Sequence, residues 1–170
     1  MTRFTLLASF LFVILVVDPV GAAMVYVTNF IGGSVVSVDL DSGDRTLISG
    51  GGVGSGPALV NPTGMLLDAS GNILLTNRGS GADNLLRIDV ATGNRSLVSG
   101  ATLGSGPNFA TPNDLDLDPA SGLLFVTNQA ANSVYAVDPV TGNRTVVSNG
   151  VGSGAPFQTP VGLQFINSGD

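Results

Sequence analysis

Three aspartates alternate along one short segment and could act on a ligand together. In Pro112–Asp118, acidic residues stand at positions 114, 116 and 118. Because alternate side chains of a strand share a face, we expect Asp114, Asp116 and Asp118 on one side of it. Carboxylates held this close repel each other unless water or a cation lies between them. The segment is therefore the first candidate for a binding site.

A second acidic group lies at Asp39, Asp41 and Asp44 in a Gly-containing turn. Carboxylates at such spacing sometimes gather around a calcium ion, which prefers oxygen ligands. An exposed turn, in which Asp bonds the nearby backbone, is the interpretation that we favour for this segment.

The missing residue types exclude several chemistries. The chain of 170 residues has no Cys, His, Trp, Lys or Glu. Ser-His-Asp catalysis, His-ligated zinc, thiolate chemistry, Schiff bases and phosphate-loop lysines are therefore excluded. A net charge of −6 with 11% charged residues argues against binding to nucleic acid, which needs a basic face.

The residues that could do chemistry sit in a repeated pattern of short strands. A strand–turn–strand unit occurs at 34–49, 84–99 and 133–148, and a segment that begins with Pro occurs at 62–68, 112–118 and 160–166. A third type of segment ends in Thr-Asn at 25–29, 73–77 and 124–128. Four short strands recurring about every 49 residues predict blades of a β-propeller.

The repeat also separates architecture from function, since a residue present in all copies serves the blade. By this test the Thr-Asn pairs are structural, and Arg45, Arg95 and Arg144 are expected to bond neighbouring carbonyls or Asp. Long connections at 50–61, 100–111 and 149–159, which contain Gly-Ser-Gly, would cross from one blade to the next, and we call them the first, second and third crossing loops. We expect the hairpin turns on the opposite face of the molecule from these crossing loops.

The order P-x-G-L-x-x-D, G-N-x-L-x-T-N, V-x-x-V-D and T-G-N-R-T resembles the NHL-repeat and regucalcin/gluconolactonase group of β-propellers. The resemblance implies that Asn113 and Asp114 lie at the mouth of a central channel and hold a divalent cation, Ca²⁺ or another, and the substrate. Asp116 would lie deeper on the same face. Such a metal can polarise a lactone carbonyl and activate water. The chain departs from that group in having no Glu, and in having Thr63 and Val161 at the positions equivalent to Asn113.

The predicted fold class is all-β, with three four-stranded repeats of about 49 residues that form half or a fragment of a six-bladed propeller. Three blades do not close a ring, since closed propellers have about 4 to 8. A homodimer could complete a six-bladed ring, or the chain could be a fragment of a longer protein or an open arc. The last segment, 161–166, could complete the blade that begins at 25–29.

The N-terminus resembles a secretory signal. Arg3 precedes an apolar run over 4–17, and small residues follow at 21–23. We therefore expect a signal peptide at residues 1–23, a repeat domain at 24–170, and a secreted or periplasmic protein with no membrane association after cleavage. An uncleaved anchor is the alternative.

Our leading functional hypothesis is a non-enzymatic scaffold that binds a protein or small ligand on its crossing-loop face. Asn113, Asp114, Asp116 and Arg78 are the expected ligand-binding residues, and Arg78 would meet an anionic group. The alternative is a divalent-metal-dependent lactonase or hydrolase with the metal on Asn113 and Asp114. A purely structural part of a larger exported protein is the third possibility.

Overall fold

The computed structural model describes residues 23–79, 81, 83–150 and 152–166. The predicted signal peptide, apart from its last residue, lies outside the described residues. Over the part of the chain that is described, every regular element is a strand, and no helix is long and apolar enough to cross a membrane.

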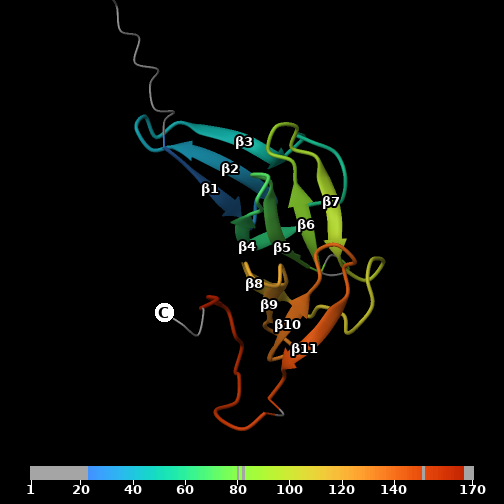
Figure 1. Ribbon diagram of the computed structural model, residues 1–170. Helices are drawn as coiled ribbons and strands as arrows, with labels where there is room; N and C mark the ends of the chain where they lie inside the picture. The colour runs from blue at the N-terminus through green and yellow to red at the C-terminus, as the bar shows by residue number, and fades with distance from the viewer. Residues whose placement is uncertain (1–22, 80, 82, 151, 167–170) are drawn as a thin grey trace, which may run out of the picture.

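The strands form three antiparallel sheets, which follow one another along the chain (Figure 1). We call them blades 1, 2 and 3. Blade 1 has three strands and blades 2 and 3 have four each, all paired in chain order. The strands of blade 1 are β1 (Met24–Asn29), β2 (Ser34–Asp39) and β3 (Arg45–Gly50). Those of blade 2 are β4 (Asn61–Leu67), β5 (Ile73–Arg78), β6 (Asn84–Ile88) and β7 (Arg95–Ser99), and those of blade 3 are β8 (Pro112–Leu117), β9 (Leu124–Asn128), β10 (Ser133–Val137) and β11 (Arg144–Ser148).

The expected all-β fold of repeated blades is confirmed, but the third Pro-led segment differs from the prediction. Residues 160–166 are extended without belonging to any sheet, and β1 pairs only with β2 among the described strands. The chain therefore does not pair its own last segment with its first strand. Instead the segment runs beside blade 3 (Figure 1), where its backbone contacts β8.

The hydrophobic core lies between the blades. Ile73 and Leu75 of β5 belong to the cluster shared with blade 1, whereas Leu74 belongs to the cluster shared with blade 3. All three side chains are buried. Because alternate residues of a strand face opposite ways, both faces of blade 2 are covered by neighbours. This explains why the central strands read as continuous apolar runs.

The repeated Thr-Asn pairs join consecutive blades, as expected of structural residues. The hydroxyl of Thr28 donates to the carbonyl oxygen of Thr63 at 2.8 Å, and that of Thr76 donates to the carbonyl oxygen of Asn113 at 3.0 Å. Thr127 makes the equivalent, longer contact with the carbonyl of Val161 at 3.5 Å. Each threonine therefore holds the next Pro-led segment along the chain. In blades 2 and 3 this segment is the first strand of the sheet, which we call the inner strand.

The repeated arginines form a second joint, which we call the arginine clasp. Arg144 donates from Nε to the carbonyl oxygen of Pro107 and from Nη1 to Ser99 Oγ, each at 2.7 Å. Arg95 repeats the clasp one blade earlier, with the carbonyl oxygen of Pro57 at 2.7 Å and Ser49 Oγ at 2.8 Å. The expectation that these arginines bond neighbouring carbonyls is confirmed for both. Burial lowers the pKa of Arg144.

The hairpin turns do not lie apart from the crossing loops, contrary to our expectation. The N–H and the hydroxyl of Ser55, in the first crossing loop, both donate to Asn94 Oδ1 in the β6–β7 turn at 2.8 Å. A Cβ at Gly104, which has a φ of 81°, would overlap the carbonyl of Gly142 in the β10–β11 turn. The right-handed twist of each blade brings the end of its last strand toward the turn of the next blade.

Replacing Arg144 should destabilise the fold much more than replacing Arg45. Arg144→Ala removes several charge-assisted hydrogen bonds and leaves the carbonyl of Pro107 without its donor, so we expect a loss of about 2–4 kcal/mol. Within one copy Arg45 is exposed, and its replacement by Ala should cost the monomer less than about 0.5 kcal/mol. Urea unfolding at a concentration where the chain sediments as a monomer measures both; equal losses would show that the clasp does not contribute to the stability of one copy.

Turn carboxylates should make the fold sensitive to acid. The pKa of Asp138 is lowered by hydrogen bonds from the Thr141 hydroxyl and from the N–H of Val140, and the pKa of Asp39 by the N–H groups of Ser42 and Asp41. A carboxyl whose pKa is lower when folded stabilises the fold above its unfolded pKa of about 3.9, and this is lost as the pH falls through the folded pKa. The melting temperature should therefore drop between about pH 4 and pH 2, less so in Asp138→Asn. An identical pH profile for that variant would contradict this assignment.

Candidate functional site

Side chains from all three blades meet at the end of the molecule where β4 begins and β5 ends. The guanidinium of Arg78 lies over the ring of Phe30 at 4.7 Å from the ring centroid. Its Nη1 donates to Asn113 Oδ1 at 3.0 Å and to Gln129 Oε1 at 2.9 Å. We call Phe30, Arg78, Asn113 and Gln129 the mouth cluster. Blade 1 supplies Phe30, blade 2 Arg78, and blade 3 the two amides.

The mouth cluster is built from equivalent positions of the repeat. Phe30, Arg78 and Gln129 each follow a structural Thr-Asn pair, so their backbones occupy the same place in successive blades. The pair before them is the same in all three copies, whereas this position is aromatic, cationic and amide in turn. Because the blade does not require one residue type here, the position is free to serve binding.

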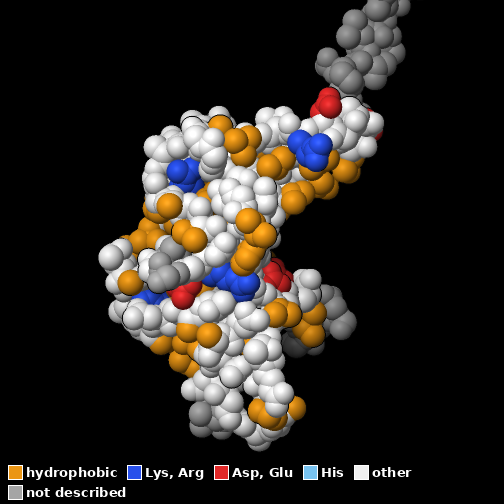
Figure 2. Space-filling model, turned by 180° about the vertical axis from the view of Figure 1, so that it is seen from behind, with side chains coloured by type: hydrophobic (Ala, Val, Ile, Leu, Met, Phe, Trp, Pro, Cys, Tyr) orange, Lys and Arg blue, Asp and Glu red, His pale blue; other side chains and the backbone are white. Residues whose placement is uncertain are grey.

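Arg78 retains donors for a ligand. Its Nε and Nη2 atoms make no hydrogen bond to any other described residue, and the side chain is half-buried. These two nitrogens present the parallel donors that a carboxylate accepts in a bidentate pair. Figure 2 shows basic side-chain atoms in the middle of one face of the molecule, with acidic atoms on either side.

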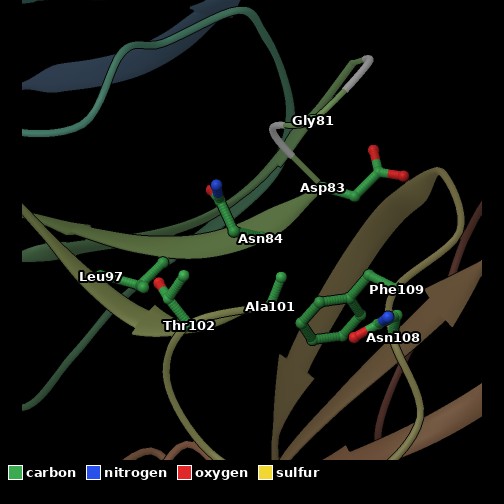
Figure 3. A pocket seen from close by; sticks show the side chains of 8 residues that line it. All are labelled: Gly81, Asp83, Asn84, Leu97, Ala101, Thr102, Asn108 and Phe109. Atoms are coloured by element: carbon green, nitrogen blue, oxygen red, sulfur yellow. The ribbon is translucent and has the colours of Figure 1, made fainter.

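Two hollows share Gly81 and Asp83, and one of them adjoins the mouth cluster. One, of about 460 Å³, is lined by Arg78 together with Asn61, Gly79, Gly81, Asp83 and Thr111. The other, of about 310 Å³, lies between the β5–β6 loop and the second crossing loop. In Figure 3, Asn108 and the ring of Phe109 lie on one side of this second hollow, with Leu97 and Thr102 on the other. Its lining is mixed, since amides, a carboxylate and a hydroxyl lie beside apolar side chains.

Asp83 has a positioning role between the two hollows. Its Oδ1 accepts from the N–H of Gly79 at 3.0 Å, and its Oδ2 accepts from the N–H of Thr111 at 3.1 Å. Thr111 has a φ of 58°, which is unfavourable for a β-branched residue. Thr159 repeats this backbone, with a φ of 51° and its N–H donated to Asn132. The strain at Thr111 therefore belongs to the blade junction.

Asp114 and Asp116 bind the last described segment of the chain. Asp114 Oδ2 accepts from the N–H of Leu163 at 2.9 Å, and Asp116 Oδ2 accepts from the N–H of Phe165 at 2.7 Å. The other oxygen of each carboxylate accepts the N–H of the next residue in β8. Backbone N–H groups thus supply hydrogen-bond donors to two of the three neighbouring carboxylates.

The donor set does not favour a divalent cation at the predicted ligands. The oxygen of Asn113 already accepts from the cationic Arg78, and the carboxylate of Asp114 accepts from two N–H groups. Over the described residues, no three acidic side chains gather closely enough to hold a metal ion. In the turn at 39–44, Asp39 Oδ1 accepts the N–H groups of Asp41 and Ser42, as expected of a turn residue. A metal on Asn113 and Asp114 remains a prediction.

The sequence predicted that Arg78 and Asn113 lie near each other at the channel mouth. It did not predict three residues beside them, namely Phe30, Gln129 and Asp83. Phe30 and Gln129 could have been found by comparing the residue that follows each Thr-Asn pair, because that position changes in every copy. Asp83 stands in the β5–β6 loop, which is one residue longer than its counterparts, but no pattern in the sequence shows that it would bond Thr111.

No family model matches the sequence, and no curated protein matches it either.

Solved structures do resemble the fold. A chain of the nidogen/laminin complex matches with a TM-score of 0.60 and 21% identity, over 81% of this chain and 46% of that chain. The extracellular domain of a candidate hybrid two-component system from Bacteroides thetaiotaomicron matches with a TM-score of 0.52 and 12% identity, over 80% and 16% of the two chains. A candidate 6-phosphogluconolactonase from Bacteroides uniformis matches with a TM-score of 0.50 and 19% identity, over 84% and 40%.

The chain spans less than half the length of each of these structures. At these identities the likeness concerns the fold alone. Together with the repeated sheets, the interblade cores and the recurring joints, it identifies the chain as a set of β-propeller blades.

Proposed function

We propose that the chain is an exported, non-enzymatic scaffold that binds a protein segment or a small ligand through a carboxylate at the mouth cluster. The observation that carries this proposal is the convergence of Phe30, Arg78 and Gln129, the three residues that differ at one position of the repeat, on a single point.

The chemistry of the cluster favours an anionic partner. Asn113 and Gln129 fix the guanidinium of Arg78 from one side through Nη1. Because Nε and Nη2 make no bond to other described residues, a carboxylate would gain two charge-assisted hydrogen bonds there without displacing a protein partner. The hollow beside Arg78, and the second hollow that shares Gly81 and Asp83 with it, could accept the remainder of the ligand.

The signal-like N-terminus supports export, and one of the similar structures is an extracellular domain. We propose that the protein acts outside the cytoplasm, in the periplasm or as a secreted protein.

Arg78→Gln should weaken carboxylate binding at the mouth cluster, because it removes the positive charge and the paired donors. As a probe we would titrate gluconate into the ¹⁵N-labelled chain and follow the amide signals of Gly79, Asn113 and Gln129. Wild type should show saturable shifts, and the variant should bind at least about 10-fold more weakly.

Arg87→Gln is the matched control, since Arg87 lies in the same blade and pairs with Asp68 at 3.0 Å, away from the mouth cluster. It should keep wild-type binding while losing the same charge. Shifts that are equal in wild type and both variants, or absent in wild type for gluconate, citrate and an acetylated Asp dipeptide alike, would overturn the proposal.

The second candidate, a divalent-metal-dependent lactonase of the regucalcin/gluconolactonase type, rests on Asn113 and Asp114 and on the likeness to the Bacteroides uniformis protein. Because the oxygens of both residues already accept from Arg78 or from N–H groups, we expect Ca²⁺ at millimolar concentration to leave the melting temperature of the chain unchanged. A rise with Ca²⁺ that disappears in Asp114→Asn, but persists in Asp41→Asn, would instead support the lactonase.

A further inference from the structure

The two outer surfaces of this arrangement of blades are complementary halves of one joint. Inside the chain, each junction between blades has a loop side and a receiving side. The loop side supplies a crossing loop and the Pro-led segment after it, and the receiving side supplies the Thr-Asn strand and the arginine that contact them. Blade 1 has a receiving side without a partner, and the region after β11 has a loop side without a partner in the described structure.

The receiving side without a partner is blade 1, at the open edge of β1. Val25 and Val27 are 41% and 46% exposed, whereas their equivalents Ile73 and Leu75 in β5 are both at 0%. The difference arises because blade 1 packs on the face of blade 2 that holds Ile73 and Leu75, whereas no described blade packs on the same face of blade 1. In addition, β1 pairs with β2 alone in the described structure, while β5 pairs with both β4 and β6. An unpaired strand edge with exposed valines favours the addition of a further strand.

The loop side without a partner contains the extended segment at 160–166. It is placed as an inner strand: Asp114, Asp116 and Thr127 hold its backbone, and Phe165 stacks on Phe125 with ring centroids 5.9 Å apart. Yet no described strand pairs with it. Val161 and Ile166 remain 54% and 80% exposed.

The two halves of an arginine clasp also lie apart, with the arginine in blade 1 and the serine at the end of blade 3. Arg45 is exposed, unlike Arg144, which is 4% exposed in its clasp. At the other end, Ser148 is equivalent to Ser49 and Ser99, the hydroxyls that receive Arg95 and Arg144. A Cβ at Gly43 or at Gly152 would meet nothing, although their counterparts Gly93 and Gly104 are in close contact with a neighbouring blade.

We propose that a second copy of this chain supplies both missing partners, so that two copies exchange their last segments and close a six-bladed ring. Residues 160–166 of each copy add to the edge of β1 in the other, as β4 adds to β5. The β8–β9 register, Pro112 with Asn128 and Leu115 with Val126, then pairs Pro160 with Asn29 and Leu163 with Val27.

The second joint closes at the same time. Arg45 of one copy reaches Ser148 and the third crossing loop of the other, as Arg144 reaches Ser99 and the second crossing loop. A heterologous contact of this kind gives a closed assembly when its rotation returns to the start, and two sets of three blades fall within the range of closed propellers. The exposed valines on both surfaces become buried.

Mixing two single-cysteine chains tests the exchange, because the protein has no cysteine of its own. Val27→Cys and Leu163→Cys should each remain unlinked when oxidised alone, whereas their equimolar mixture should form a disulfide-linked dimer. The matched control is Val146→Cys mixed with Leu163→Cys: Val146 is 44% exposed, like Val27 at 46%, but lies away from the predicted pairing, and this mixture should not crosslink.

The mass in solution gives a second readout. Sedimentation of the unmodified chain should show twice the monomer mass, and Arg45→Ala should raise the dimer dissociation constant about 10-fold without changing the blade structure in NMR spectra. A monomer at all concentrations up to about 1 mM overturns the proposal. So does a dimer that fails to crosslink at Val27 and Leu163, or a double Val27→Cys, Leu163→Cys chain that links only within itself. Gluconate binding through Arg78 is measured independently, so either proposal can fail alone.

Discussion

The structure depends on burying the two faces of each small sheet against neighbouring blades. Both hydrophobic clusters of the described chain span a junction, one between blades 1 and 2 and the other between blades 2 and 3. A four-stranded sheet of this size has no interior of its own, so its stability comes from the next sheet. The polar joints are consistent with this requirement. The Thr-Asn pair fixes the inner strands, and the arginine clasp fixes the crossing loop at the outer strands.

The fold was predictable from the sequence because the same pattern of strands and turns occurs in three copies. The turn glycines, the Thr-Asn pairs and the Pro-led segments each gave the correct strand or turn in blades 2 and 3. The wrong predictions concern contacts between separate segments, which the spacing of the repeat does not show. Residues 160–166 resemble β4 and β8, yet a strand forms only where an edge is available to pair with it. The contact between Ser55 and Asn94 depends on the twist of the blade, which sequence spacing does not specify.

The candidate site was predictable only in part, for a related reason. Alternation placed Asp114 and Asp116 on β8, but it could not show which donors would face them. Those donors are the N–H groups of Leu163 and Phe165, 49 residues away in each case. Three carboxylates in a row thus suggested a cation, whereas the fold gives two of them backbone donors. Arg78 was found because it is unique among the repeats, and the same criterion identifies Phe30 and Gln129.

Binding and assembly concern different surfaces, yet the geometry links them. Within one copy, Phe30 comes from blade 1, and Asn113 and Gln129 come from blade 3, so the mouth cluster needs both junctions to be intact. Asn113 also donates from Nδ2 to the carbonyl of Val161 at 2.8 Å, inside the segment that would be exchanged. Pairing of that segment with β1 of a second copy would hold Val161 in place. Asn113 would then be fixed from one side by Val161 and from the other by Arg78. A closed ring would therefore preorganise the guanidinium, and ligand binding would in turn favour the closed ring, because such coupling is reciprocal.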